Sequence, residues 1–166
     1  MRRWLAAAPI AALALLCVSF AAGAAYGEDA PVAAPRFMSL KTANANGRSG
    51  PGLGHPVDWV YARAGLPLLV TAEDGPWRRV RDPDGGEVWM HADNLEARRT
   101  VYVLDGPAAP LRRNPQSSGG VLALLAPGVI GTLTACRGDW RRVSIGGRVG
   151  WVPKERLWAA QDCTGL

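Results

Sequence analysis

Histidine, cysteine and paired acids are the residues of this chain whose types and spacing could support catalysis or metal binding. The chain has two histidines, His55 and His91. Neither has a Cys or a carboxylate at a recognisable motif spacing, so the sequence predicts no nucleophile–base pair. Two isolated histidines without clustered cysteines or acids do not make a zinc site. We therefore expect no catalytic residue, no metal and no cofactor.

Two further patterns resemble chemical motifs only superficially. Asp82 and Asp84 stand in Asp-Pro-Asp-Gly-Gly, where such residues shape a hairpin turn more often than they form an acid pair. The segment 50–54 is rich in glycine like a phosphate-binding loop, but no transition from strand to helix follows it. Neither pattern predicts an active site.

The N-terminal segment 1–25 has the composition of a secretory signal. Arg2 and Arg3 precede an apolar run, and small residues follow from Ala21 to Ala25. The run is too short for a stable membrane span and ends in a small-residue exit suited to cleavage. We expect an exported protein, periplasmic or secreted, with no membrane span after the signal is removed.

Two cysteines remain after that processing, Cys136 and Cys163. An exported protein meets an oxidising compartment, which permits a disulfide. A bridge between these two would tie the C-terminal tail to the domain that precedes it, and a free thiol is the alternative.

The segment Trp77-Arg78-Arg79-Val80 recurs 63 residues later as Trp140-Arg141-Arg142-Val143. A second Trp follows each copy, Trp89 in the first and Trp151 in the second. A period of this length indicates one small fold built twice. The predicted organisation is a signal at 1–25, a flexible leader at 26–36, repeats at 37–97 and 98–159, and a tail at 160–166.

Each repeat consists of short β-rich segments separated by turns. The segments 82–86 and 146–147 carry the Asp and Gly residues that hairpin turns require. No stretch beyond the signal keeps a helical period for ten residues, although 93–95 and 154–156 are each suited to one 3₁₀ turn. Many short strands with regular turns predict an all-β fold of two small barrels in tandem. The expected strands are 37–41, 58–63, 67–73, 77–81 and 87–91 in repeat one, and 110–112, 121–125, 129–136, 140–145 and 148–152 in repeat two.

Alternation along the strands assigns the tryptophans to a face. If the aliphatic residues Val80, Met90, Val143 and Val152 fill the barrels, the four motif tryptophans lie on the opposite face. An outward Trp is costly to leave bare, so it should pack on a loop, on the sister domain or on a ligand. Sealing of loops or of the seam between domains is one interpretation, and an exposed aromatic groove is the other.

The pattern Gly-x-Trp-basic-x-Val, followed by Gly-Gly-x-x-Gly-Trp-Val, resembles the bacterial SH3-like (SH3b) domain. Arg48-Ser49-Gly50-Pro51-Gly52 is similar to an early turn of that family. The resemblance covers roughly residues 36–159 and extends to exported proteobacterial proteins with tandem SH3 domains. It implies two small SH3-like barrels with a binding or scaffolding role. SH3b domains elsewhere often accompany cell-wall enzymes and bind peptidoglycan.

Gly47 departs from this pattern, because the family usually has an aliphatic residue there; repeat two keeps Leu111. The first barrel is therefore expected to lack one core side chain. Gly150-Trp151-Val152-Pro153 also resembles the eukaryotic SH3 segment whose aromatic residue and proline line the ligand groove. That resemblance implies the groove candidates Trp77, Trp89 and His91 in repeat one and Trp140, Trp151 and Pro153 in repeat two. The loop 44–56 holds no acid to meet a ligand arginine, which disfavours proline-rich peptides.

Charge limits the class of partner. Without Arg2 and Arg3 the chain keeps 17 Lys and Arg against 14 Asp and Glu, a net charge of +3. The basic residues are scattered among acids, whereas a nucleic-acid binder shows a dense basic face. The sequence thus favours a non-catalytic binding module for cell-wall peptidoglycan or an envelope protein or peptide. A structural or assembly accessory of the envelope, with the tryptophan faces buried between the domains, is the alternative.

Overall fold

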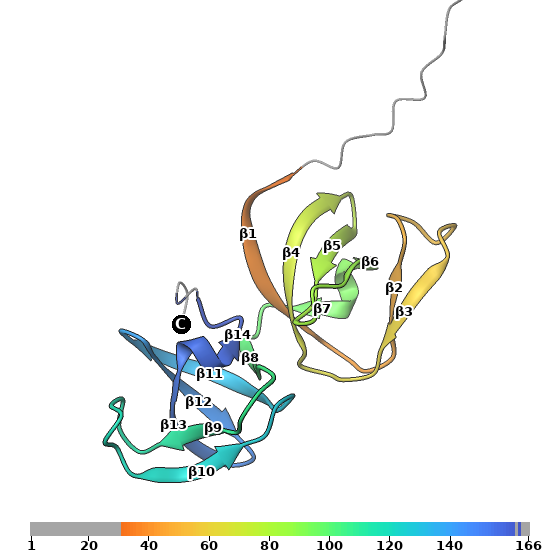
Figure 1. The fold of residues 1–166 in the computed structure, drawn as a ribbon. Coiled ribbons are helices and arrows are strands. Elements are labelled where there is room, and N and C mark those ends of the chain that lie inside the picture. The colour runs from red at the N-terminus through yellow and green to blue at the C-terminus, as the bar shows by residue number, and fades with distance from the viewer. Residues whose placement is uncertain (1–30, 162, 164–166) are drawn as a thin grey trace, which may run out of the picture.

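Short strands separated by glycine and proline turns make up almost all of the protein that the computed structural model describes, residues 31–161 and 163. Fourteen strands and two 3₁₀ turns are found in this part. The predicted signal at 1–25 and residues 26–30 lie outside the described residues. No helix in the described part is long and apolar enough to cross a membrane. The fold is all-β, with one barrel for each repeat, as predicted (Figure 1).

Repeat one forms a seven-stranded sheet in the order β3-β2-β6-β5-β4-β1-β7. Every pairing between these strands is antiparallel. The strands are β1 (Pro31–Leu40), β2 (Ala45–Arg48), β3 (Val57–Tyr61), β4 (Pro67–Asp74), β5 (Trp77–Arg81), β6 (Glu87–His91) and β7 (Leu95–Glu96), with the 3₁₀ turn η1 (Ala92–Asn94) before β7.

Repeat two repeats this topology in the order β10-β9-β13-β12-β11-β8-β14. Its 3₁₀ turn also lies between the last two strands, at the position predicted from sequence. The elements are β8 (Thr100–Val103), β9 (Ala109–Arg112), β10 (Val121–Leu125), β11 (Ile130–Arg137), β12 (Trp140–Ile145), β13 (Arg148–Pro153), η2 (Lys154–Arg156) and β14 (Leu157–Trp158).

The expectation of a flexible leader over 26–36 is wrong for residues 31–36. Strand β1 begins at Pro31, and Arg36 pairs with Val70 of β4 in register. Antiparallel pairing to a long neighbouring strand extends β1 beyond the segment whose own residues predict a strand. Four other short strands, β2, β7, β8 and β14, were also not predicted, because none of them shows an alternation long enough to recognise.

Each barrel encloses its own hydrophobic core, and the face assignment made from alternation is confirmed for the aliphatic residues. Val80, Met90, Val143 and Val152 are fully buried. Burial of a Val or Met side chain contributes about 1.5–3 kcal/mol relative to leaving it exposed. These side chains therefore hold β5, β6, β12 and β13 in the positions that carry the motif tryptophans.

The two barrels meet through a small buried polar contact flanked by aromatic rings. Thr100 Oγ1 donates a hydrogen bond to the Gly65 carbonyl at 2.7 Å, and Ser39 Oγ donates to the Arg98 carbonyl at 2.5 Å. The rings of Phe37 and Trp158 pack edge to face with centroids 5.5 Å apart. Ser39 and Thr100 are both buried, so their hydroxyls satisfy carbonyls that would otherwise lose their water.

The C-terminal tail is fixed to repeat two by a disulfide between Cys136 and Cys163, which confirms the predicted pair. The Arg141 side chain, which is only 4% exposed, adds a hydrogen bond from Nε to the Ala160 carbonyl. The tail thus covers the guanidinium of Arg141, the residue that follows Trp140.

Candidate functional site

Repeat two carries an open groove beside its motif tryptophan. Trp140 and Pro153 are register partners on β12 and β13, and both line the groove. It has a volume of about 640 Å³. We call it the Trp140 groove; its lining residues are Pro110, Arg112, Ser117, Asp139, Trp140, Pro153, Lys154 and Glu155.

Charges of both signs border the Trp140 groove. Lys154 Nζ lies 2.7 Å from Asp139 Oδ1 at its rim, and this contact lowers the pKa of the Asp139 carboxyl. Arg112 donates from Nη1 to the Gly119 carbonyl at 2.7 Å, which fixes the loop after β9. An aromatic plane between fixed cations and carboxylates suits a ligand with an apolar face and ionised groups of both signs.

Trp151 lies outside this lining, so the structure separates it from the other two candidates of repeat two. It is half-buried, and the Arg137 guanidinium carbon lies 5.7 Å from the centroid of its ring. This cation–π contact occupies the indole face with a side chain of the protein itself.

In repeat one, the equivalent pair Trp77 and His91 is brought together but packed ring against ring. The two are register partners on β5 and β6, and their ring centroids lie 5.5 Å apart with the planes perpendicular. His91 Nδ1 accepts a hydrogen bond from the Asp93 backbone N–H at 3.3 Å, which caps η1. His91 therefore occupies the position that Pro153 has in repeat two, and its side chain caps the 3₁₀ turn η1.

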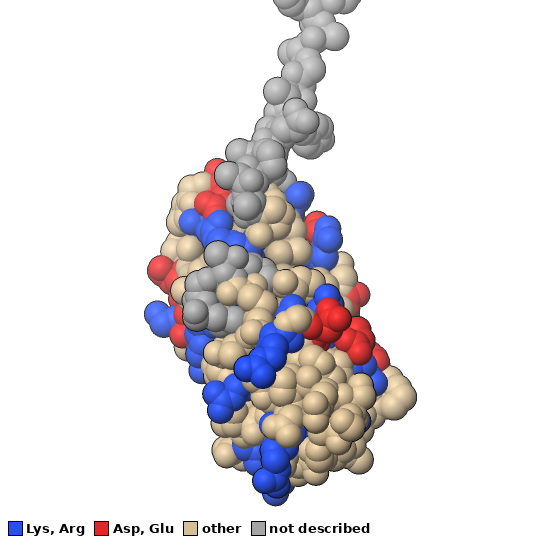
Figure 2. Space-filling view, turned by 90° about the vertical axis from the view of Figure 1, so that its left-hand side faces the viewer, with Lys and Arg blue, Asp and Glu red and all other residues tan. Residues whose placement is uncertain are grey.

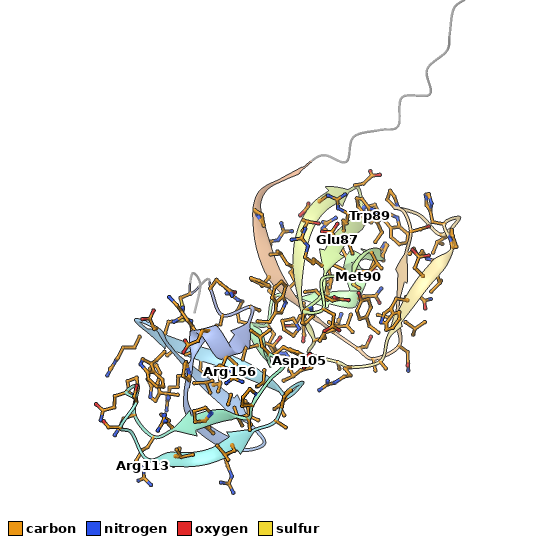
Figure 3. The ribbon with its side chains drawn as sticks, viewed as in Figure 1. Glu87, Trp89, Met90, Asp105, Arg113 and Arg156 are labelled. Atoms are coloured by element: carbon orange, nitrogen blue, oxygen red, sulfur yellow. A yellow bond between two sulfur atoms is a disulfide. The ribbon has the colours of Figure 1, made fainter. Side chains whose placement is uncertain are left out.

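Trp89, predicted to face outward with the other tryptophans, is buried at 5% exposure. Figure 3 labels Trp89 and its neighbour Met90 on β6, and of the two only Met90 belongs to the core cluster of the barrel. Strand β6 is central in its sheet, and the neighbouring strands place Arg48 and Arg79 opposite Trp89 in register. Trp89 thus follows the first of the two interpretations that the sequence left open, and its indole packs within repeat one instead of lining an open groove.

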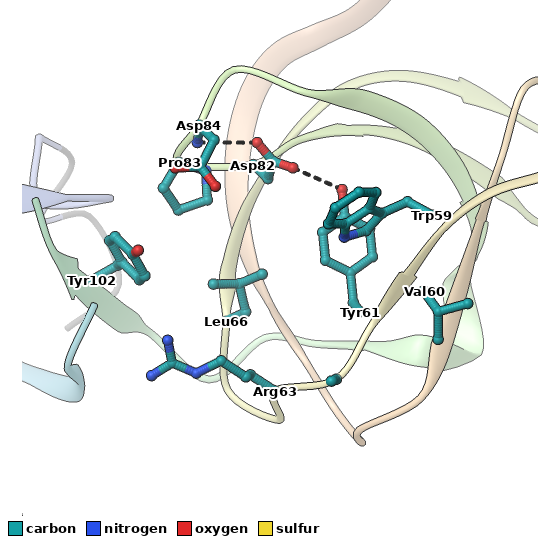
Figure 4. A pocket seen from close by; sticks show the side chains of 10 residues that line it. Trp59, Val60, Tyr61, Arg63, Leu66, Asp82, Pro83, Asp84 and Tyr102 are labelled. Carbon is teal, nitrogen blue, oxygen red and sulfur yellow. Dashed lines mark hydrogen bonds between the residues drawn. The ribbon is translucent and has the colours of Figure 1, made fainter. Parts of the chain in front are cut away.

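Trp59 was not among the predicted candidates, although it is strongly exposed and lies outside the recurring tryptophan motifs. It lies on β3 and is 61% exposed. It borders a hollow with Tyr61, Asp82 and Asp84 (Figure 4). It was missed because alternation was applied to the recurring tryptophan motifs, and Trp59 lies outside both copies. An aromatic residue next to an acid in an edge strand was the signal available.

No group of three or more His, Cys, Asp or Glu that could hold a metal is found among the described residues. The His55 ring packs against Gly50, where an added Cβ would lie 2.5 Å from His55 Nδ1. Its backbone carbonyl accepts a hydrogen bond from Arg48 Nη1 at 2.7 Å. His55 thus shapes the loop between β2 and β3.

On the face shown in Figure 2, acidic side chains lie among Lys and Arg on the upper barrel and near the junction, and the lower barrel shows Lys and Arg in separate patches. This scattered arrangement differs from the continuous basic surface that binds a nucleic-acid backbone.

A family model described as "Bacterial SH3 domain" matches the chain twice, at residues 41–96 and 105–159. A comparison with curated proteins found no match. Among solved structures, NlpC2 from Trichomonas vaginalis matches with a TM-score of 0.34 and 14% identity, over 75% of this chain and 48% of that one. NlpC1 from the same organism matches with a TM-score of 0.35 and 14% identity, over 75% and 45%. The chain spans about half the length of each.

Proposed function

Because the chain belongs to the bacterial SH3 domain family, a family of binding modules, we propose that it is a non-catalytic, exported module that binds cell-wall peptidoglycan through the Trp140 groove. An envelope protein or peptide is the second candidate ligand for the same groove. The signal-like segment 1–25 supports export, to the periplasm or the medium.

The pairing of Trp140 with Pro153 in an open groove is the observation that carries this proposal. A tryptophan face packs well on the apolar face of a sugar ring or on peptide methylenes. Arg112 and Lys154 supply cations, and Asp139 and Glu155 supply carboxylates. A peptide-bearing glycan offers the complementary groups, since its stem peptides carry both carboxylates and amines.

The alternative role, an assembly accessory whose tryptophan faces are buried between the barrels, has less support. The rings that meet at the junction are those of Phe37 and Trp158. Trp140 instead lines the groove of its own barrel. A ligand therefore has access to at least one of the motif tryptophans.

Co-sedimentation with purified peptidoglycan sacculi tests the proposal. The oxidised chain from residue 26 onward is compared with the double variant Trp140→Ala/Pro153→Ala. The matched control is Trp77→Ala/His91→Ala, which removes the equivalent pair from repeat one. We expect the groove variant to lose at least tenfold in affinity, since an aromatic anchor commonly contributes 2 kcal/mol or more, and the control to bind like the wild type.

Thermal unfolding verifies that both variants remain folded. Equal loss in the two variants, or wild-type binding by the groove variant, would overturn the assignment to the Trp140 groove. If the wild type is not retained at all, peptidoglycan is excluded as the ligand. A photoreactive group placed at Ser117 on the groove rim then tests for an envelope protein.

A further inference from the structure

Strand β3 presents an unusual combination of an exposed tryptophan and an open strand edge. It is the terminal strand of its sheet and pairs with β2. Val57, Trp59 and Val60 on it are 42%, 61% and 50% exposed. Exposed edges are normally protected by charges, prolines or bulges. Strand β3 has part of this protection, since it carries Asp58 and a bulge interrupts its pairing with β2. Its three exposed apolar side chains nevertheless form an apolar patch of the kind that marks an interaction surface.

Two adjoining cavities lie against this strand. One, of about 250 Å³, extends toward repeat two and includes Tyr102. The other, of about 360 Å³, extends along the 82–86 turn. Trp59, Tyr61, Asp82 and Asp84 line both. We call the combined site the Trp59 hollow; Figure 4 shows its aromatic and acidic side chains on facing elements.

The hairpin turn that carries the acids is held rigidly. Tyr61 donates a hydrogen bond from its hydroxyl to Asp82 Oδ2 at 3.0 Å. Asp82 Oδ1 accepts from the backbone N–H groups of Asp84 and Gly86 at 3.0 and 2.8 Å. The two oxygens of Asp82 are thus engaged in structure, which positions the exposed Asp84 at the rim.

The hollow is negatively charged in a chain whose net charge is positive. Asp58, Asp82, Asp84 and Glu87 line it, against Arg63. Glu87 is paired with Arg81 at 2.6 Å, and Arg63 donates to the Gly128 carbonyl at 2.5 Å. Within residues 31–161, the structure shows no ion pair for Asp58 or Asp84. These two carboxylates remain available to an incoming cation.

The negative charges of the hollow also act on its two tyrosines, Tyr61 and Tyr102. Burial, followed by the charge of Asp82, raises the pKa of Tyr61 well above its ordinary value. Burial, followed by the charges of Asp84 and Asp105, raises the pKa of Tyr102. Burial disfavours a charge of either sign, so only the contribution of the nearby carboxylates to these shifts favours a bound cation.

We propose that the Trp59 hollow binds an arginine or lysine side chain of an extended peptide segment in a partner protein. The cation stacks on the face of Trp59, and Asp84 and Asp58 accept its hydrogen bonds. The free edge of β3 lies beside the segment that carries the cation. This site is distinct from the Trp140 groove, because the two share no lining residue.

The test uses tetra-arginine with blocked termini as the probe and tetra-glutamate as the charge control. Binding is measured at 0.15 M salt by calorimetry on the oxidised chain, with Trp59→Ala and Asp84→Asn as site variants. Leu124→Ala is the matched control for the exposed apolar residue, because Leu124 is 68% exposed on the equivalent strand β10. Asp74→Asn is the control for the lost charge, because Asp74 is exposed on β4 and lines neither cavity of the hollow.

We expect saturable binding of tetra-arginine that falls at least fivefold in each site variant and less than twofold in each control. Absence of tetra-arginine binding, or an equal loss in Asp74→Asn, would overturn the proposal, the latter by showing diffuse attraction to surface acids. Binding of tetra-glutamate with similar affinity would also overturn it. Retention of Trp59→Ala on sacculi separates a failure at this site from a failure of the Trp140 groove.

Discussion

Repeats one and two fill the same position of the barrel with their large and small side chains exchanged. In repeat one, Gly47 of β2 faces Val88 of β6, and a Cβ added to Gly47 would lie 2.6 Å from Val88 Cγ2. In repeat two, Leu111 of β9 faces Gly150 of β13, and a Cβ added to Gly150 would lie 2.7 Å from Leu111 Cγ. The core side chain expected to be missing at Gly47 is thus replaced from the opposite strand.

The arginine after the motif tryptophan shows what the two barrels share. Arg78 Nη1 donates to the Gly75 and Trp77 carbonyls at 2.7 and 2.9 Å. Arg141 Nη1 donates to the Gly138 and Trp140 carbonyls at 2.8 and 3.1 Å. In both repeats the guanidinium closes the turn before the strand.

Repeat two differs from repeat one in two ways: the C-terminal tail covers its arginine, and the groove beside its tryptophan is open. Its tail and disulfide bury Arg141, whereas Arg78 keeps a more exposed side chain. Its groove beside Trp140 is open, whereas in repeat one His91 packs on Trp77. The same scaffold thus carries an open groove in one copy and a packed aromatic pair in the other.

Removal of the disulfide should have the largest effect on this comparison, because only repeat two carries a disulfide within the described residues. The bridge closes a sequence separation of 27 residues, and a loop of that length corresponds to about 3 kcal/mol of stabilisation. Cys136→Ser/Cys163→Ser should lower the free energy of unfolding by that amount in urea denaturation. An unchanged free energy of unfolding would show that the tail does not stabilise repeat two.

The exchanged side chains predict the next largest effect. Gly47→Leu inserts a side chain into space occupied by Val88 and should destabilise the protein by about 2 kcal/mol. Gly47→Leu/Val88→Gly reproduces the arrangement of repeat two and should recover part of that loss. The same urea titration measures the double variant. If it is less stable than Gly47→Leu alone, the two repeats do not fill this position by exchanging a large and a small side chain.

The shared arginine should contribute more in repeat two than in repeat one. Arg141→Met removes charge-assisted hydrogen bonds to carbonyls that include the buried one of Ala160, for a loss of about 2 kcal/mol. Arg78→Met removes more exposed bonds and should cost about 1 kcal/mol. Thermal unfolding of the two variants checks the order, and a larger loss for Arg78→Met would reverse the comparison.

Alkaline pH should weaken repeat one through Tyr61, whose counterpart in repeat two is Leu125. The folded-state pKa of Tyr61 is raised above its ordinary value of 10.0 by burial and by Asp82. The neutral phenol is favoured in the folded state, so this stability is fully present below pH 10 and is lost as the pH rises above it. The loss is at most about 1.4 kcal/mol per pH unit for one group.

Urea denaturation between pH 9 and 11 measures this effect, with Tyr61→Phe as the control. The variant should show a smaller decline in the free energy of unfolding. An identical decline in both proteins would show that Tyr61 does not carry the pH dependence.

Much of the fold was predictable because its signals are local. The Trp-Arg-Arg-Val repeat, the alternation that buries Val80 and Val143, and the turns at 82–86 and 146–147 each depend on adjacent residues. The disulfide was predicted from the two cysteines that lie beyond the predicted signal. The start of strand β1 at Pro31 was not predicted, because its pairing partner β4 lies far along the chain.

The candidate site was predictable only in part for the same reason. Trp140, Trp151 and Pro153 were expected to line one ligand groove. Trp140 and Pro153 line the Trp140 groove and Trp151 lies outside it, and ligand binding there stays a prediction. The burial of Trp89 and the contact of Arg137 with Trp151 depend on which side chains neighbouring strands bring alongside. The Trp59 hollow joins β3 to a turn more than 20 residues later and to Tyr102 of the other repeat, a combination that no single segment reveals.

The most direct test of the central claim is a titration of the oxidised chain with soluble peptidoglycan fragments, observed through its tryptophan indole N–H signals by NMR. The account predicts that the signal of Trp140 shifts in a saturable way while that of Trp77 stays in place. Single Trp→Phe variants assign the signals. A shift of Trp77 without a shift of Trp140 would contradict the claim that the binding surface belongs to repeat two.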